Sequence, residues 1–526
     1  MRGAPFDIIL WREIIINSRN NKETIMQHIH TSVRVCLAAA TAAISAVCAG
    51  ATVVFPSAGR DIASADDWGG TLPGASDVLR FNTGATVTAS NNVEFGGFFV
   101  GAQSTTVVLD MRDEVSGGSP RHVKMNGAAY IPENTWNAKY VLRGGLWDFG
   151  GNSVCTGLSG DYSGNTGTSA QIDGGAVVLC GSLAGRIGAA GTANSVSVIG
   201  LGTIVTAKTV EVAQFSGRNN RFAFSDGAKV VLAGSGSALS LSSGNITSKD
   251  SSGNSLRVAG GAALVQPEAG GTHTVGNAGK NNVLSVEDGG YVSLNGNLHF
   301  AYAGDSRASN SSGNRISVSG AGSSLSVGQV FFGIGGATSA NSNNVVSVSD
   351  GAVLTNAYTF IRGHDNGFVI SNATMWTTHG GIECRDDEYG KAANCFVKLQ
   401  GKKPRLVVNG SEGECHFRGS FRFEYDIPED GYETVPVTLN EWARMAENTE
   451  FIVNGIPQLQ VSMRQRGVRK ASYTLFRANN DMEAGPTDAM LERWNARLTV
   501  GATLSYASRA LKLDVYAHSP MCLIIR

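Results

Sequence analysis

A short alternation of apolar and polar residues recurs along the middle of the chain. Each copy begins with Asn, continues with two apolar residues separated by another residue, and ends in a turn rich in Gly or Asp. Successive asparagines are 26, 34, 28, 32, 30 and 22 residues apart. Recurrence at such a period is typical of a stacked repeat protein. The clear copies occupy residues 194–198, 220–224, 254–258, 282–286, 314–318, 344–348 and 366–370.

The copy that starts at Asn282 shows what one repeat predicts. Apolar residues alternate with polar ones over residues 283–287, which is the period of a β-strand. A turn is expected at 288–290, because Gly accepts positive φ at low steric cost. Alternation resumes at 292–294 and at 298–302, and it predicts a second and a third strand. The segment 304–313 returns to the next Asn, and we expect variation in that segment to account for the uneven spacing.

Three short strands per turn, stacked in parallel, define a β-helix. Stacked strands lie about 4.8 Å apart, so about a dozen turns between residues 76 and 400 would form a rod on the order of 60 Å long. We expect the seven repeat asparagines to bond to one another as an amide ladder. The turns should stack in the same way, at 226–227, 260–261, 288–289 and 350–351.

The regularity of the pattern divides the chain into four parts. Residues 1–51 hold a dispensable start and an export signal, and 52–190 hold irregular turns that begin with a linker or capping strand. Residues 191–400 form the regular array, although the copy at Asn394 has Lys398 where an apolar residue belongs. That copy is either off register or already the end of the array.

Residues 401–526 carry more charge and more aromatic residues, and we expect them to form a mixed α/β cap. An open solenoid end exposes strands and core, so a polar cap is needed; a separate functional domain is the alternative. Helices are predicted at 439–450, with Trp442, Met445 and Ala446 on one face, and at 488–498, with Thr487 or Asp488 as the N-cap. Strands are predicted at 472–477 and 510–515.

The N-terminal region predicts export through the Sec pathway. Arg34 precedes an apolar, Ala-rich run over residues 35–49, and Ala49-Gly50-Ala51 has the small residues of a cleavage site. We expect the mature chain to begin near Thr52 and the biological start to be Met26. The run is short for a membrane span, which needs about 20 residues; an uncleaved signal anchor is the alternative.

Export permits disulfides, and six cysteines follow the expected cleavage site. Cys384 and Cys395 flank one loop and can pair, and Cys155 and Cys180 lie about one repeat apart and can join neighbouring turns. Buried free thiols are an equal expectation for all of them, including Cys415 and Cys522. No C-x-x-C motif occurs, which argues against a zinc ribbon or a thioredoxin-like site.

A net charge of -1 implies no polybasic or polyacidic partner, and the isolated basic residues do not suggest nucleic-acid binding. Candidate chemistry is sparse, and we expect no catalytic, cofactor-binding or metal-binding residue. Asp226, Asp288 and Asp350 each precede Gly, so we interpret them as turn residues. The acidic stretch 383–388 has four carboxylates but lacks the spacing of a calcium loop. We interpret it as a solvated loop.

Five further residues are of types that bind ligands. His364 and His379 lie near the acidic stretch without metal-motif spacing, and we interpret them as loop residues. Trp136, Trp147 and Trp376 can stack on sugars, although burial in the solenoid core is the simpler expectation.

The repeats resemble those of autotransporter passenger domains, in particular the repeat class that these share with exported bacterial surface proteins. The resemblance is carried by residues 344–354, 324–328 and 332–336, and by the closing segment 473–515. It implies a right-handed β-solenoid at the cell surface or in the medium. We expect no translocator barrel within this chain, because no run of alternating membrane strands follows the repeats.

The expected function is therefore a non-enzymatic, exported β-solenoid with a structural or adhesive role. Its expected partners are glycans or surface proteins, with peripheral association with the cell surface, no nucleic acid and no small-molecule cofactor. Two alternatives remain at this point. One is a carbohydrate-active β-helix enzyme that uses the 383–388 region, and the other is a passenger whose translocator is encoded separately or lost.

Overall fold

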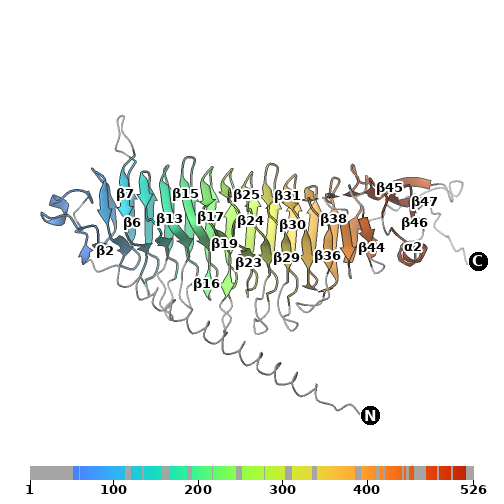
Figure 1. Ribbon diagram of the computed structural model, residues 1–526, viewed down its shortest axis with the longest axis horizontal. Coiled ribbons are helices and arrows are strands. Elements are labelled where there is room, and N and C mark those ends of the chain that lie inside the picture. The colour runs from blue at the N-terminus through green and yellow to red at the C-terminus, as the bar shows by residue number, and fades with distance from the viewer. Residues whose placement is uncertain are drawn as a thin grey trace, which may run out of the picture.

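Short strands that alternate buried and outward residues make up most of the described chain, and they wind into a long parallel β-helix (Figure 1). The predicted fold class is confirmed: the described part of the chain is nearly all β, with one α-helix near its C-terminal end. The computed structural model describes residues 51–57, 60–112, 120–132, 135–156, 166–185, 192–215, 217–244, 251–277, 279–301, 311–333, 341–384, 392–409, 415–418, 421–440, 443–445, 449–454, 469–482, 485–498 and 501–516.

Most turns of the solenoid contribute one strand to each of three columns, as the repeat predicts. The first column is a 14-stranded parallel sheet that contains the strand of every Asn copy. Its strands are β3 (Ala85–Val87), β6 (Thr106–Asp110), β9 (Lys139–Arg143), β12 (Ser169–Asp173), β14 (Ser195–Ile199), β17 (Arg221–Ser225), β21 (Ser255–Val258), β24 (Val283–Glu287), β27 (Arg315–Ser319), β30 (Val345–Ser349), β34 (Gly367–Ser371), β38 (Cys395–Gln400), β41 (Phe421–Asp426) and β44 (Glu450–Asn454).

The middle column follows the Gly-rich turn of each repeat. Its strands are β4 (Val93–Phe95), β7 (His122–Met125), β10 (Leu146–Asp148), β13 (Val177–Ala184), β15 (Ile204–Glu211), β18 (Lys229–Leu232), β22 (Ala263–Val265), β25 (Tyr291–Ser293), β28 (Ser324–Ser326), β31 (Val353–Asn356), β35 (Thr374–Thr377), β39 (Arg405–Val408), β42 (Val437–Leu439) and β45 (Arg469–Ala478).

The third column completes each turn, and β13 and β15 belong to it as well because they are long enough to span both columns. Its other strands are β1 (Thr52–Val54), β2 (Val78–Phe81), β5 (Gly97–Val100), β8 (Ala129–Tyr130), β11 (Ser153–Cys155), β19 (Ala238–Ser240), β23 (His273–Val275), β26 (Leu298–Phe300), β29 (Val330–Phe332), β32 (Thr359–Ile361), β36 (Ile382–Cys384), β40 (Cys415–Arg418) and β43 (Ala443–Met445). Two short parallel pairs lie beside the columns: β16 (Gln214–Phe215) with β20 (Ser243–Gly244), and β33 (Gly363–His364) with β37 (Ala392–Ala393).

One hydrophobic core runs along the inside of the coil. The apolar residues of the Asn copies point inward, so that Leu284 and Val286, for example, are fully buried. Aromatic rings of neighbouring turns also contact one another inside the core: Phe300 and Phe332 meet edge to face, with centroids 4.9 Å apart. No single turn can bury its apolar face alone, so the stability of each turn depends on its neighbours.

The connections between columns vary at two places, where one was expected. The segment from the third to the first column varies as predicted: it holds 14 residues between β26 and β27 and five between β32 and β34. The connection from the middle to the third column also varies. It holds seven residues between β22 and β23, and β13 and β15 have none at all.

The solenoid extends beyond the boundary placed at residue 400. Strands β41 and β44 continue the first column, and β42 and β43 continue the other two. The helix predicted at 439–450 is wrong, because Ala443–Met445 is strand β43, paired in parallel with β40. Stacking on the preceding turn overrides a helical spacing that is only one turn long. Of the three residues of that predicted face, Met445 is buried and Trp442 and Ala446 lie outside the described residues.

The copy at Asn394 is off register rather than the end of the array. Cys395 pairs with the position of Asn366, and Cys395, Val397 and Leu399 point inward while Lys398 points outward. Asn394 itself has φ of 55°, as does Asn281, which precedes the repeat asparagine Asn282. Cys395 therefore takes the place of the repeat asparagine. The alternation of inward and outward residues is shifted by one position, while the strands continue to stack.

Both ends of the rod are covered. At the N-terminal end, Trp68 of the 3-10 helix η1 (Asp66–Trp68) packs against Phe55, with ring centroids 4.8 Å apart. At the C-terminal end, β45 forms an antiparallel meander with β47 (Ala510–Tyr516) and β46 (Ala502–Ala507). The helix α2 (Asp488–Asn495) is capped by Thr487, as predicted, and it places Trp494 against Phe451 of the last first-column strand.

Candidate functional site

The repeat asparagines form the expected amide ladder and are structural. Each side-chain amide donates to the side-chain oxygen of the next asparagine, and all seven side chains are buried. The Nδ2–Oδ1 distances lie between 3.0 and 3.2 Å. The ladder runs through Asn194, Asn220, Asn254, Asn282, Asn314, Asn344 and Asn366.

The turn aspartates are also structural, as predicted. Asp226, Asp288 and Asp350 have φ of 57°, 51° and 56°, and the glycine after each also has positive φ. Asp and Gly are among the residues that accept this left-handed conformation most easily. The carboxylates face solvent on three separate turns of the solenoid, with the Gly260 and Gly320 turns between them, so they do not converge.

The acidic stretch is described only at its first two residues, Glu383 and Cys384; residues 385–388 lie outside the described part of the chain. Glu383 is on the outer side of β36, and the hydroxyl of Tyr358 donates to its Oε2 at 3.1 Å. His364 and His379 are both exposed, and His379 Nδ1 lies 2.8 Å from the hydroxyl of Thr378. Within the described ranges, no three His, Cys, Asp or Glu side chains are grouped so that they can hold a metal ion.

The three candidate tryptophans do not share one environment. Trp147 is fully buried, and its indole N–H donates to the carbonyl of Gly144 at 2.7 Å. The core prediction is wrong for the other two, because Trp136 is 50% exposed and Trp376 points outward from β35. The guanidinium of Arg405 lies over the Trp376 ring, 5.2 Å from its centroid. The burial of Trp136 and Trp376 was predicted from residue type alone. Both side chains occupy outward-facing positions.

An outward aromatic column lies beside Glu383 and was not anticipated. His299, Phe331 and Phe360 occupy the same outer position of β26, β29 and β32, and Glu383 follows them on β36. Phe331 and Phe360 stack nearly parallel, with centroids 5.0 Å apart. Phe331 and Phe360 therefore cover each other's facing sides, and His299 meets Phe331 edge to face, so the column offers few open faces for a sugar to stack on. Burial lowers the pKa of His299.

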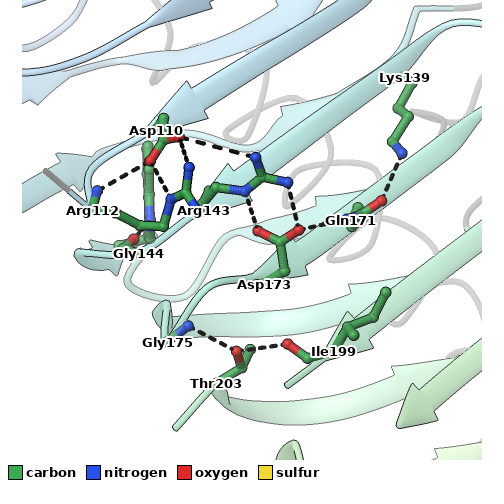
Figure 2. Close-up of polar contacts among 11 residues, drawn as sticks. Asp110, Arg112, Lys139, Arg143, Gly144, Gln171, Asp173, Gly175, Ile199 and Thr203 are labelled. Atoms are coloured by element: carbon green, nitrogen blue, oxygen red, sulfur yellow. Dashed lines mark hydrogen bonds and ion pairs between the residues drawn. The ribbon is translucent and has the colours of Figure 1, made fainter. Parts of the chain in front are cut away.

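A ladder of ion pairs crosses three adjacent turns on the outer side of the first column (Figure 2). Arg143 bonds both carboxylate oxygens of Asp173 at 2.7 and 2.8 Å, and Arg112 bonds Asp110 at 2.9 and 2.7 Å. Lys139 donates to Gln171 at 2.6 Å, and Gln171 donates to Asp173 at 2.5 Å. Arg143 and Asp173 occupy equivalent places before Gly-Gly turns, so aligning the irregular repeats reveals this pair.

The carboxylates of this ladder are ionised and hydrogen-bonded to their partners. Burial is the largest single influence and would raise the pKa of Asp110 and of Asp173. The hydrogen bonds to each carboxylate and the positive charges of Arg112 and Arg143 together outweigh burial, so both pKa values lie below the ordinary value. Two ionised carboxylates saturated by guanidinium groups are not suited to proton transfer near neutral pH. The ladder therefore has a structural role: its charged hydrogen bonds hold adjacent turns together.

Replacing Arg143 with Met is expected to lower the free energy of unfolding by about 1–2 kcal/mol, because Asp173 is left partly buried without its bidentate partner. Urea unfolding at pH 7 measures this loss. Lys124→Met is the matched control, since the Lys124–Glu94 pair also joins adjacent turns but is exposed at both ends, and its loss should be clearly smaller than that of Arg143→Met. Equal losses for the two variants would contradict the role of Arg143 in holding adjacent turns together.

Neither expected disulfide is formed. Cys155, Cys180, Cys384 and Cys395 are buried as thiols, which confirms the alternative for these four. Burial raises the pKa of Cys180 to about 12, so it stays protonated and unreactive. The side chain of Cys415 and all of Cys522 lie outside the described residues.

A second amide ladder lies near the C-terminal end and was not predicted. Asn440 donates to Asn409, and Asn479 donates to Asn440, in three successive middle-column turns. These residues sit just after the strands instead of before them, so the Asn-first pattern does not detect them.

The fold and these contacts define the molecule as a parallel β-solenoid repeat protein. Comparison of the chain with protein-family models, with curated proteins and with solved structures finds no match. In the described parts of the chain, no helix is both long and apolar enough to cross a bilayer.

Proposed function

We propose that this protein is exported and acts outside the cytoplasm as a non-enzymatic β-solenoid, with a structural or adhesive role like that of the passenger domains it resembles. The observation that carries the proposal is that its buried and paired polar residues have structural roles. The repeat asparagines and the best-connected ion pairs bond between neighbouring turns, and the turn aspartates occupy left-handed turn positions. The polar network thus serves a stiff, extended rod.

Such a rod suits attachment better than catalysis. It offers long lateral surfaces, and contacts spread along a surface can add avidity without a deep site. Its expected partners are glycans or proteins at a cell surface, and neither a nucleic acid nor a small-molecule cofactor is part of the proposal.

Export is tested by expressing the full chain in a bacterial host and locating it. We expect mass spectrometry to find a mature N-terminus near Thr52, and protease added to intact cells, or assay of the medium, to detect the protein outside. The matched control is Leu37→Arg with Ala39→Arg, which interrupts the apolar run and should hold the full-length chain in the cytosol. Cytosolic retention of the full-length wild-type chain would contradict the proposal.

Catalysis is tested separately with the purified chain. Incubation with a broad panel of polysaccharides is expected to release no oligosaccharide. Cleavage that is lost on replacing Asp386 and Asp387 with Asn would overturn the non-enzymatic role.

A further inference from the structure

The surface of the rod has a notch where the connection between middle and third strands is missing. Four residues, 149–152, separate β10 from β11, and five residues, 233–237, separate β18 from β19. Strands β13 and β15 lie between these two turns and run straight through. Two adjacent turns therefore lack the projection that their neighbours have on either side.

The notch is an open depression with a volume of about 480 Å³. This volume lies in the range of small-molecule sites, ~300–1,000 Å³. Gly151 belongs to one wall and Ala233 to the other, while Leu179, Ser182 and Lys208 are among the residues of the floor. Glycine is required beside the wall, because a Cβ on Gly181 would come within 2.1 Å of the carbonyl oxygen of Gly151.

The floor carries polar and apolar side chains that make no stabilising contact of their usual kind within the described structure. Ser182 is only 8% exposed, and its hydroxyl has no hydrogen-bond partner in the described structure. Lys208 is exposed and forms no ion pair with any described residue. Leu179 is 36% exposed, an unusual position for leucine on this rod. An unused buried hydroxyl is costly unless a ligand or water satisfies it.

The backbone of the floor is closed to a peptide strand. Strands β13 and β15 are paired on both sides, with β10 and β11 before them and with β18 and β19 after them. An added strand needs an open sheet edge, and none is present in the notch. Recognition must therefore come from side chains: the hydroxyls of Ser182, Thr206 and Thr209, one ammonium group and one apolar side chain.

We propose that the notch binds an acidic saccharide, with a carboxylated sugar whose carboxylate pairs with Lys208 and whose hydroxyls bond to Ser182, Thr206 and Thr209. Hydroxyl side chains both donate and accept, which matches the hydroxyls of a sugar. Leu179 packs against the apolar face of the ring. The inference rests on the proposed adhesive function and specifies the class of glycan that the rod would bind.

The experiment is calorimetric titration of the purified full chain with sialyllactose and with trigalacturonic acid, each compared with neutral lactose. We expect binding of at least one acidic ligand and no binding of lactose. Lys208→Ala should weaken binding at least about ten-fold, because a hydrogen-bonded charge pair is lost. Thr206→Trp, which fills the notch from an outward position, should abolish binding.

Lys229→Ala is the matched control, since Lys229 is an exposed lysine on the next turn, outside the notch. It should leave the affinity within about two-fold, and circular dichroism should show that all variants keep the β fold. Acidic binding that survives both Lys208→Ala and Thr206→Trp would place the site elsewhere and leave an adhesive role standing. Absence of binding to both acidic ligands overturns the notch proposal, whereas failure of the proposed function would appear independently as cytosolic retention.

Discussion

Replacing Asn282 with Ala is expected to lower the free energy of unfolding by about 3–6 kcal/mol, the largest effect of any single polar substitution discussed for this rod. The side-chain oxygen of Asn282 accepts from both the backbone N–H and the side-chain amide of Asn254, and its own amide donates to Ser251 and Asn314. Alanine removes all four bonds at a position with no access to solvent. The backbone N–H of Asn254 is then left without a partner, and a buried polar group in that state costs about 1–3 kcal/mol.

Urea unfolding followed by circular dichroism measures the loss, and hydrogen exchange locates it. Because a solenoid unfolds by neighbouring units, the amide of Asn254 should lose protection before amides several turns away. Ser317→Ala is the control, since Ser317 lies on the outer side of β27. Its effect should remain within about 0.5 kcal/mol. A loss below about 1 kcal/mol for Asn282→Ala would mean that the ladder does not stabilise the stack.

The repeat could be predicted from the sequence because its determinants are local. Alternation over residues 283–287 sets which side chains face inward, and the Asp288-Gly289 turn needs residues that accept positive φ. The ladder follows once the strands are stacked in register, since Asn282 then lies directly between Asn254 and Asn314. Stacking converts a pattern along the chain into contacts across it.

The errors share a different physical origin, which is tertiary context. The segment 439–450 has a helical spacing over a single turn, but the exposed edge of β40 offers complete backbone pairing and favours strand β43. The cysteine pairs were chosen from separation along the chain, which does not specify the approach of Cβ atoms that a disulfide needs. The notch arises because β13 and β15 lack the connection that other turns have between their middle and third strands. A missing connection leaves no sequence motif that could predict the notch.

The ion-pair ladder and the amide ladders together suggest why the outer surface is so uneven in charge. Where the Asn copies are regular, buried amides hold neighbouring turns together and the outward positions are largely Ser, as at Ser317 and Ser347. Charged pairs cross between turns in both parts of the rod: Arg143 with Asp173 where the copies are degraded, and Arg257 with Glu287 within the regular array. In the irregular part, such pairs act without the support of the Asn ladder.

Lowering the pH from about 6.5 to about 4 is expected to cost the folded protein about 3 kcal/mol of stability through one residue, His273. Its ring is completely buried: Nδ1 accepts from the backbone N–H of Leu239 at 3.1 Å, and Nε2 lies 2.9 Å from Oε1 of Gln266. This arrangement requires the neutral tautomer with its proton on Nε2. Burial lowers the pKa of His273 to about 4, from an ordinary value of 6.5.

The sign follows from proton uptake. Between pH 6.5 and 4, His273 is protonated in the unfolded chain but largely neutral in the folded state. Lowering the pH therefore favours unfolding in that window. The stability is fully present above pH 6.5 and stops declining from this source below about pH 4. His299 acts in the same direction, whereas Asp110 and Asp173 have pKa values below the ordinary 3.8 and contribute at lower pH.

Urea unfolding at several pH values between 7 and 4 tests this directly. His273→Gln is expected to flatten the dependence across the window, even if it lowers stability at every pH. Exposed His364 supplies the matched control, and His364→Gln should keep the wild-type slope because its ring faces water in the folded state. A wild-type stability that is equal at pH 7 and pH 4.5, or a His273→Gln variant with an unchanged slope, would show that the buried ring does not govern the acid sensitivity of the rod.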